Sequence, residues 1–240
     1  MKRDNLTLLS PMNSKSIVDQ IIERLTGTIM RGELKPGQKI PTEAELSESM
    51  HVARNSVREA IKALVSMGVL VIRRSEGTFV ADGFSDKMLD PMVYGLVLEG
   101  GSTPAVVELR RIVEVGVLQL AVEKASDDDI RMLTQAFDSF ARIVRENPND
   151  SQMLLNADMA FHQRIQRIVA NPMVERIQQV IERVSSPTRV RATEQFMRSG
   201  EIEHMIELHH QLLMVIRDRD SASVGRVMDD HFGYWKSELT

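Results

Sequence analysis

The chain has 240 residues, 42% of them hydrophobic, which is enough for one or two domains with buried cores. It contains no cysteine, which excludes disulfides, thiolate metal ligands and cysteine nucleophiles and fits a reducing compartment. No apolar run approaches the roughly 18 residues of a membrane span. The basic stretch at residues 1–16 lacks the apolar core of a signal peptide. The sequence therefore predicts a soluble, cytoplasmic protein without a membrane partner.

The formal net charge of −4 argues against a nucleic-acid partner only while its distribution is ignored. Residues 1–82 carry 12 Lys or Arg against 10 Asp or Glu, whereas residues 83–240 carry 18 against 24. Five basic residues and one acid lie between residues 51 and 74. The basic charge is therefore concentrated in one short segment.

Three short helices and a hairpin are predicted in the first eighty residues. The first helix begins after Ser14 or Ser16 and ends at Gly32, with apolar residues four apart between them. Thr42 begins a capping box that leads into a second helix at 43–50. A third helix at about 55–67 follows the short break HVAR. The runs VLVIRR and TFVA flank a turn at 75–77 and predict the hairpin.

This order of elements is typical of a winged helix-turn-helix, whose helix after the turn enters the major groove of DNA. Arginine can pair with guanine, asparagine with adenine, and serine with a base or phosphate. The glycine at the hairpin tip permits close approach to the DNA backbone. The predicted DNA-binding residues are Arg54, Asn55, Ser56, Arg58 and Gly77. The alternative is a small basic helical module with a solvated face.

The stretch LKPGQKIPTEAELSESMHVARNSVREAIKALVSMGVLVIRRSEGTFV resembles the DNA-binding domain of the GntR family of bacterial transcription regulators. The resemblance implies base and phosphate contacts at the five residues just named. Ala44 departs from the pattern, because FadR-type members often carry arginine there. We therefore expect a DNA-binding domain at 14–82 without a contact from position 44.

A linker is predicted at 83–102, with a helix in two pieces broken near Asp90-Pro91 and a reset at residues 100–102. A second domain, 103–240, shows helical patterns throughout and no convincing strand. Its predicted helices are 105–124, 127–146, 151–169, 172–185, 188–198, 201–218 and 221–237. The predicted fold is mainly α, with the winged domain followed by an antiparallel bundle of six or seven helices.

Four polar residues interrupt the apolar stripes of these helices, namely Asp158, His162, His209 and His231. Each histidine alone is more typical of a hydrogen-bonded core residue. Burial of all four together is costly unless they share a partner, and a divalent cation can satisfy them at once. Three nitrogens and one oxygen suit Zn²⁺, Ni²⁺ or Mn²⁺. Periodicity alone leaves His210 as an alternative to His209.

The motifs D-M-A-F-H, A-N-P and H-x-x-L-L-x-x-I followed by D-x(10)-H resemble the FCD ligand-binding domain of the FadR subfamily of GntR regulators. Many members of that subfamily bind a metal through an Asp and three His in this order. The resemblance thus implies that Asp158, His162, His209 and His231 are ligands, and it favours His209 over His210. It also argues against the fatty-acid-responsive branch, in which these ligands are missing.

Arg110 lies on an apolar stripe and is the predicted contact for an effector. Periodicity leaves two alternatives open, a surface ion pair between Arg110 and Glu114, or Arg111 as the inward arginine. The family pattern E-x-R-x-x-x-E matches Glu108, Arg110 and Glu114, and its arginine often meets an effector carboxylate. The resemblance therefore implies a small organic acid, such as a hydroxy or sugar acid, as effector.

Together these features predict a homodimeric transcription regulator, specifically a repressor, that binds an inverted-repeat DNA operator. Its helical domain would bind a divalent metal and a small organic acid that alters operator binding. The alternative is a metal-dependent hydrolase or isomerase with a DNA-binding appendage. The chain has no H-E-x-x-H motif and no evident general base, which favours the regulator over an enzyme.

Overall fold

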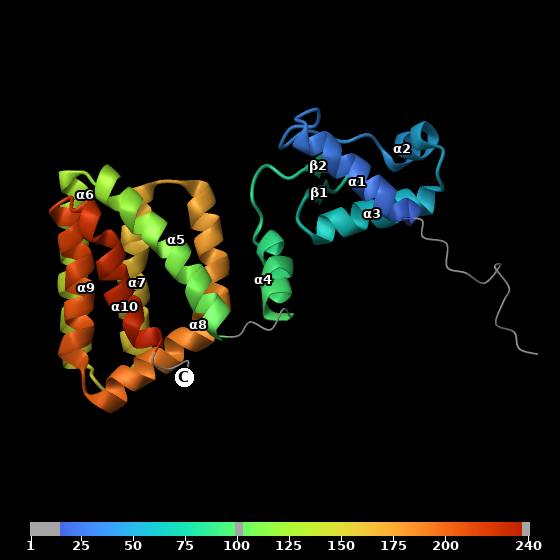
Figure 1. Cartoon of the computed structure of the whole chain (residues 1–240). Coiled ribbons are helices and arrows are strands. Elements are labelled where there is room, and N and C mark those ends of the chain that lie inside the picture. Colours follow the sequence, from blue (N-terminus) through green and yellow to red (C-terminus); the bar gives the residue numbers. More distant parts are fainter. Residues whose placement is uncertain (1–14, 99–102, 237–240) are drawn as a thin grey trace, which may run out of the picture. The chain divides into compact units, whose positions relative to one another are not determined.

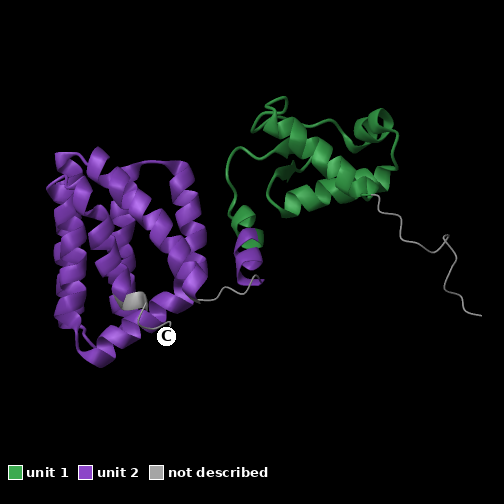
Figure 2. Cartoon of the chain, in the orientation of Figure 1, with its two compact units in different colours: residues 1–91 green, residues 92–240 purple. Residues whose placement is uncertain are grey.

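The computed structural model describes residues 15–98 and 103–236, which divide into two compact units at Pro91 and Met92 (Figure 2). The alternative cap Ser14, the expected reset at residues 100–102 and the expected helix end at 237 lie outside the described residues. No helix within the described ranges is long and apolar enough to cross a membrane.

The first unit is a winged helix-turn-helix, as predicted (Figure 1). It contains α1 (Ile17–Met30), α2 (Glu43–Met50), α3 (Arg54–Ser66), β1 (Leu70–Arg73) and β2 (Gly77–Val80). Ser16 caps α1, and Thr42 forms the expected capping box with Glu45 at the start of α2. The antiparallel hairpin pairs Leu70 with Val80 and Arg73 with Gly77.

The turn between α2 and α3 depends on a left-handed backbone at His51, where φ is 53°. This conformation ends α2 sharply, so α3 begins three residues later. One apolar cluster holds the three helices and the hairpin together and includes Leu25, Leu46, Val57 and Leu64. Because Val57 is fully buried, its neighbours on α3 face solvent.

The segment after the hairpin is helical over the predicted residues, but its two pieces meet earlier than predicted. A 3₁₀ turn at Asp86–Met88 leads directly into α4 (Leu89–Leu98). The break expected at Asp90-Pro91 is wrong, because Pro91 lies in the first turn of α4. An amide hydrogen there has no partner within the helix, so proline costs no hydrogen bond.

From Thr103 onward, the second unit is a bundle of six α-helices within the described residues (Figure 1). They are α5 (Thr103–Lys124), α6 (Asp127–Glu146), α7 (Ser151–Val169), α8 (Pro172–Ser199), α9 (Ile202–Arg217) and α10 (Val224–Lys236). A 3₁₀ turn at Ser221–Ser223 precedes α10. Helix α5 packs against α7, α8, α9 and α10, so its side chains line the centre of the bundle.

Helix α8 differs from the prediction, because it runs unbroken through Pro187 where two helices were expected. Proline removes one backbone hydrogen bond and its ring crowds the preceding turn, which bends a helix without ending it when packing holds both halves. Figure 1 shows that the axis of α8 changes direction along its length. Ile181 and Ala192, one on each side of the proline, are both buried and hold the two halves in the bundle.

Candidate functional site

The predicted DNA-binding residues of α3 gather at its N-terminal end. Arg54, Asn55 and Arg58 are exposed, and Ser56 is half-buried. They project away from Val57, which anchors the other face of the helix in the core. A helix that presents polar and basic side chains at its exposed N-terminus is suited to the major groove.

An acid that the sequence analysis did not single out, Glu43, holds Arg58. The Nε and Nη2 atoms of Arg58 donate to Glu43 Oε2 at 3.1 and 2.9 Å, and Arg54 Nε lies 4.0 Å from the same oxygen. These hydrogen bonds, together with the negative charge of Glu43, raise the pKa of Arg58. The signal was present in the sequence, since Glu43 begins one and Arg58 lies near the start of the other of the two helices that flank the tight turn.

Gly77 lies in the β1–β2 hairpin, which is the wing, and has a backbone conformation that only glycine adopts without strain. Its φ is +124°, and a Cβ atom there would lie 2.6 Å from Cε of Lys39. Arg73 lies over the ring of Phe79 at 4.4 Å and donates to Asp82 at 3.0 Å, so its guanidinium is held against the hairpin. The exposed Arg74 is the more accessible arginine of the wing.

The structure brings together the four residues predicted as metal ligands. Asp158 and His162 lie on α7, His209 on α9 and His231 on α10, and all four are buried. One ring nitrogen from each histidine lies within 4.8 Å of the others. His209 belongs to this cluster, whereas the side chain of His210 is 42% exposed and contacts Phe137.

Asp158 has the position expected of a fourth ligand. Its Oδ1 atom lies 2.9 Å from His209 Nε2 and 3.5 Å from His162 Nε2. Two ligands held about 2.1 Å from one ion in tetrahedral or octahedral geometry are about 3.0 to 3.4 Å apart. Both distances from Asp158 Oδ1 are therefore close to the spacing of two ligands of one ion.

His209 supplies the sharpest test of whether a cation fits. Its Nδ1 atom lies 2.8 Å from the carbonyl oxygen of Met205, and its Nε2 atom lies 2.9 Å from Asp158 Oδ1. Burial lowers the pKa of His209, so the ring carries one N–H at neutral pH. With that proton on Nδ1, a lone pair on Nε2 faces a carboxylate oxygen. A cation between these two acceptors removes the repulsion.

The other charges of the cluster are consistent with this arrangement. Burial alone would raise the pKa of Asp158, but the neighbouring His162 and His209 and the charge of Arg189 hold it well below its usual range. Burial and the neighbouring histidines push the pKa of His231 well below its ordinary value. The cluster thus offers an ionised carboxylate at Asp158 and neutral imidazoles at His209 and His231, which are the ligand forms of these side chains.

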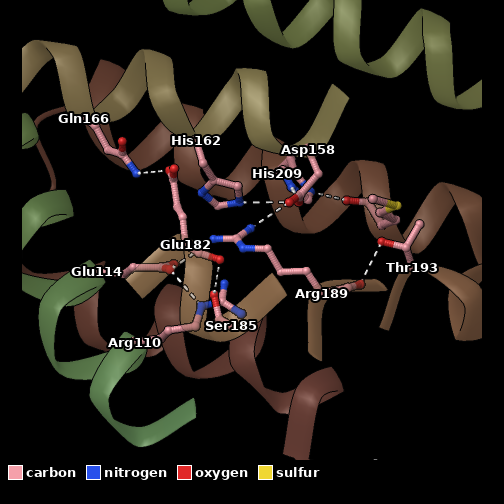
Figure 3. Close-up of polar contacts among 11 residues, drawn as sticks. Arg110, Glu114, Asp158, His162, Gln166, Glu182, Ser185, Arg189, Thr193 and His209 are labelled. Carbon is pink, nitrogen blue, oxygen red and sulfur yellow. Dashed lines mark hydrogen bonds and ion pairs between the residues drawn. The ribbon is translucent and has the colours of Figure 1, made fainter. Parts of the chain in front are cut away.

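A chain of buried charges leads away from Asp158 (Figure 3). Arg189 Nη1 donates to Asp158 Oδ2 at 2.8 Å, and its Nη2 atom donates to Glu114 Oε1 at 3.4 Å. Arg110 Nε donates to the same Glu114 oxygen at 3.1 Å. Burial, followed by the charge of Arg189, lowers the pKa of Arg110 to about 10, so Arg110 stays charged at neutral pH.

Of the two arginines that periodicity could not separate, Arg110 faces the interior. It is fully buried, whereas the side chain of Arg111 is 38% exposed and pairs with Asp229 at 2.6 Å. The ion pair between Arg110 and Glu114 also exists, but inside the bundle and not on its surface. Arg189 was missed because the expected break at Pro187 placed it in a separate short helix. Its position on a buried stripe with Ser185, Ala192 and Phe196 was the available signal.

Comparison with known protein families shows which protein class carries these two units. Residues 17–80 match the family of bacterial regulatory proteins called the gntR family, and residues 105–234 match the FCD domain. The chain is a GntR-family regulator with an FCD domain. This GntR regulator binds DNA and controls transcription, and the regulatory family decides against the enzyme alternative.

Named relatives agree with that assignment. The uncharacterized HTH-type transcriptional regulator YcbG of Bacillus subtilis is 32% identical over 165 residues, which is 68% of this chain and 66% of YcbG. The galactonate operon transcriptional repressor of Escherichia coli is 28% identical over 207 residues, 84% of this chain and 87% of the repressor. The solved structure of Streptococcus agalactiae GntR shares the fold, with a TM-score of 0.57, 23% identity, and coverage of 92% and 100%.

Proposed function

We propose that the GntR regulator is a cytoplasmic, metal-dependent repressor of the FadR subfamily that senses a small organic acid. A homodimer binds an inverted-repeat operator, with one winged domain on each half-site. The DNA contacts are Arg54, Asn55, Ser56, Arg58 and Gly77. The ligands of a divalent ion of the Zn, Ni or Mn class are Asp158, His162, His209 and His231, and Arg110 binds the effector.

The observation that carries the metal site is the pair of acceptors at 2.9 Å, His209 Nε2 and Asp158 Oδ1. His162 Nε2 and His231 Nδ1 are buried beside them without a hydrogen-bond partner in the described chain. Buried polar atoms without partners are costly, and these two come from different helices, α7 and α10. A divalent ion bound there would supply a Lewis acid with room for an oxygen of the effector.

The balance of buried charge supports an anionic effector. Two arginines, Arg110 and Arg189, are matched by two carboxylates, Glu114 and Asp158. A divalent ion added to this set leaves two uncompensated positive charges inside the bundle, which is unfavourable in a medium of low polarity. An organic acid that enters after the metal reduces that excess. The name of the galactonate operon repressor among the relatives supports a sugar acid as the effector class.

The metal content of the purified regulator tests the centre directly. Wild-type protein should hold about one divalent ion per chain by elemental analysis, and the double variant His209→Ala, His231→Ala should hold none. His204→Ala is the matched control, because His204 is exposed on the same helix as His209. Stoichiometric metal in the double variant would exclude this centre.

A further inference from the structure

A polar groove lies between α7 and α8, beside the candidate metal centre. Its volume is about 520 Å³, within the range of sites for small organic ligands. Side chains that can bind hydroxyl groups line it, namely Gln163, Gln166, Arg167, Glu175, Gln179 and Glu182. Amides both donate and accept hydrogen bonds, and carboxylates accept them, so this lining suits an alcohol-rich molecule.

The space beside the histidines is much smaller. A cavity of about 20 Å³ is lined by His162, Glu114, Gln166 and Gln178, among others. A cavity of that size holds about one water molecule, so no organic acid fits there without movement of a side chain. Gln178 is buried, and its Nε2 atom has no hydrogen-bond partner in the described part of the chain. This buried N–H group can donate a hydrogen bond to an oxygen of a ligand.

Gln166 forms part of the wall of both spaces. It lies one helical turn after His162 on α7, and its Nε2 atom donates to Glu182 Oε1 on α8 at 3.3 Å (Figure 3). The bond therefore bridges the two helices where the groove meets the small cavity. A single long, partly solvated hydrogen bond is weak, so it can open at little cost.

We propose that this groove is the entrance and outer half of the effector site, closed by the bond between Gln166 and Glu182. The inference rests on the proposed metal centre. The occupant is a polyhydroxy acid with one carboxylate, whose acid end reaches the metal and Arg110 while its hydroxylated tail lies in the groove. Glu175 and Glu182 outnumber Arg167 in the lining, which disfavours a second carboxylate on the tail.

The rate at which a chelator removes the metal tests the gate without any effector. Gln166→Ala and Glu182→Ala should each accelerate metal removal by EDTA about two- to twelve-fold, as expected for loss of one ordinary hydrogen bond. Gln119→Ala is the matched control, because it removes a Gln–Glu bond of 3.1 Å on the exposed face of α5. All variants should start with the wild-type metal content.

A block in the groove gives the opposite test. The chain has no cysteine, so Gln179→Cys creates a single thiol in the groove that a bulky maleimide can label. The label should slow metal removal and abolish the thermal shift that D-gluconate gives with metal-loaded protein, whereas labelled Gln119→Cys should behave as wild type. D-Glucarate, with its second carboxylate, should give a smaller shift than D-gluconate.

The outcomes separate this inference from the proposed function. Wild-type protein without metal would overturn the metal centre itself. Stoichiometric metal with equal removal rates in the gate, labelled and control proteins would overturn the entrance and leave the centre in place. An absent D-gluconate shift, or a larger one with D-glucarate, would overturn the assignment of the occupant.

Discussion

Replacement of Glu43 should strengthen binding to non-specific DNA but reduce the preference for the operator. Glu43→Gln removes an acid from the DNA-binding unit and releases Arg58 from two hydrogen bonds at 2.9 and 3.1 Å. A released guanidinium can neutralise one more phosphate, so binding to non-specific DNA should strengthen at low salt. At the same time Arg58 loses its fixed orientation. Glu43 occupies Nε and Nη2 and leaves Nη1 available to pair with guanine. Without Glu43, the guanidinium is no longer held in the orientation that points Nη1 toward the base.

The magnitude follows from counterion release. One additional phosphate contact per protomer steepens the slope of log K against log salt by about 0.9. Between about 50 and 200 mM salt, this slope adds a loss of about 3.5-fold per protomer. Discrimination between operator and non-specific DNA should fall by about 1 kcal/mol, the lower end of the value for one bidentate base contact.

Fluorescence anisotropy of the full-length regulator measures both quantities, with a selected operator duplex and a scrambled duplex titrated over a series of salt concentrations. Glu48→Gln is the control, because Glu48 is an exposed acid of α2 for which no arginine partner is recorded among the described residues. The reasoning fails if Glu43→Gln leaves both the salt slope and the operator preference at the wild-type values. A melting temperature close to wild type would show that the fold is intact.

Two further predictions concern the DNA contact and the acid contact. Arg58→Ala should weaken binding to the selected operator by about 1–3 kcal/mol while affecting scrambled DNA less, and equal losses on both duplexes in the same anisotropy assay would exclude a base contact. Arg110→Ala should remove the D-gluconate thermal shift but leave operator affinity unchanged, whereas Arg111→Ala, which alters a neighbour paired with Asp229 at the surface, should retain the shift. A normal shift in Arg110→Ala would move the acid-binding site elsewhere.

Local signals in the sequence predicted most helices correctly, because caps and apolar spacing act over a few residues. Thr42 and Ser126 each form a capping box where their helices begin. The same spacing placed Asp158 and His162 inside the bundle, whereas only the family resemblance favoured His209 over His210 and Arg110 over Arg111. Pro187 was misread because packing on both sides of it, which the sequence does not display, holds α8 together.

Apart from the four predicted metal ligands, polar contacts between distant segments were beyond sequence reasoning. Gln166 and Glu182 are polar residues on different helices, and nothing in their spacing pairs them. The partnership of Arg189 with Asp158 and Glu114 likewise depends on how three helices cross. A polar residue at a helix surface has many possible partners. An apolar stripe, in contrast, fixes the rotation of its helix, because the stripe must face the core.

The bend at Pro187 has a mechanical consequence. Glu182 lies before the proline and Arg189 after it, so the residue that closes the groove and the residue that holds Asp158 belong to two halves of one helix. The missing backbone hydrogen bond makes the point between them the softest part of α8. A ligand that pushes the first half outward would rotate Arg189 about this hinge. Entry of the ligand past Glu182 would then be mechanically coupled, through α8, to a change in the charge that surrounds Asp158.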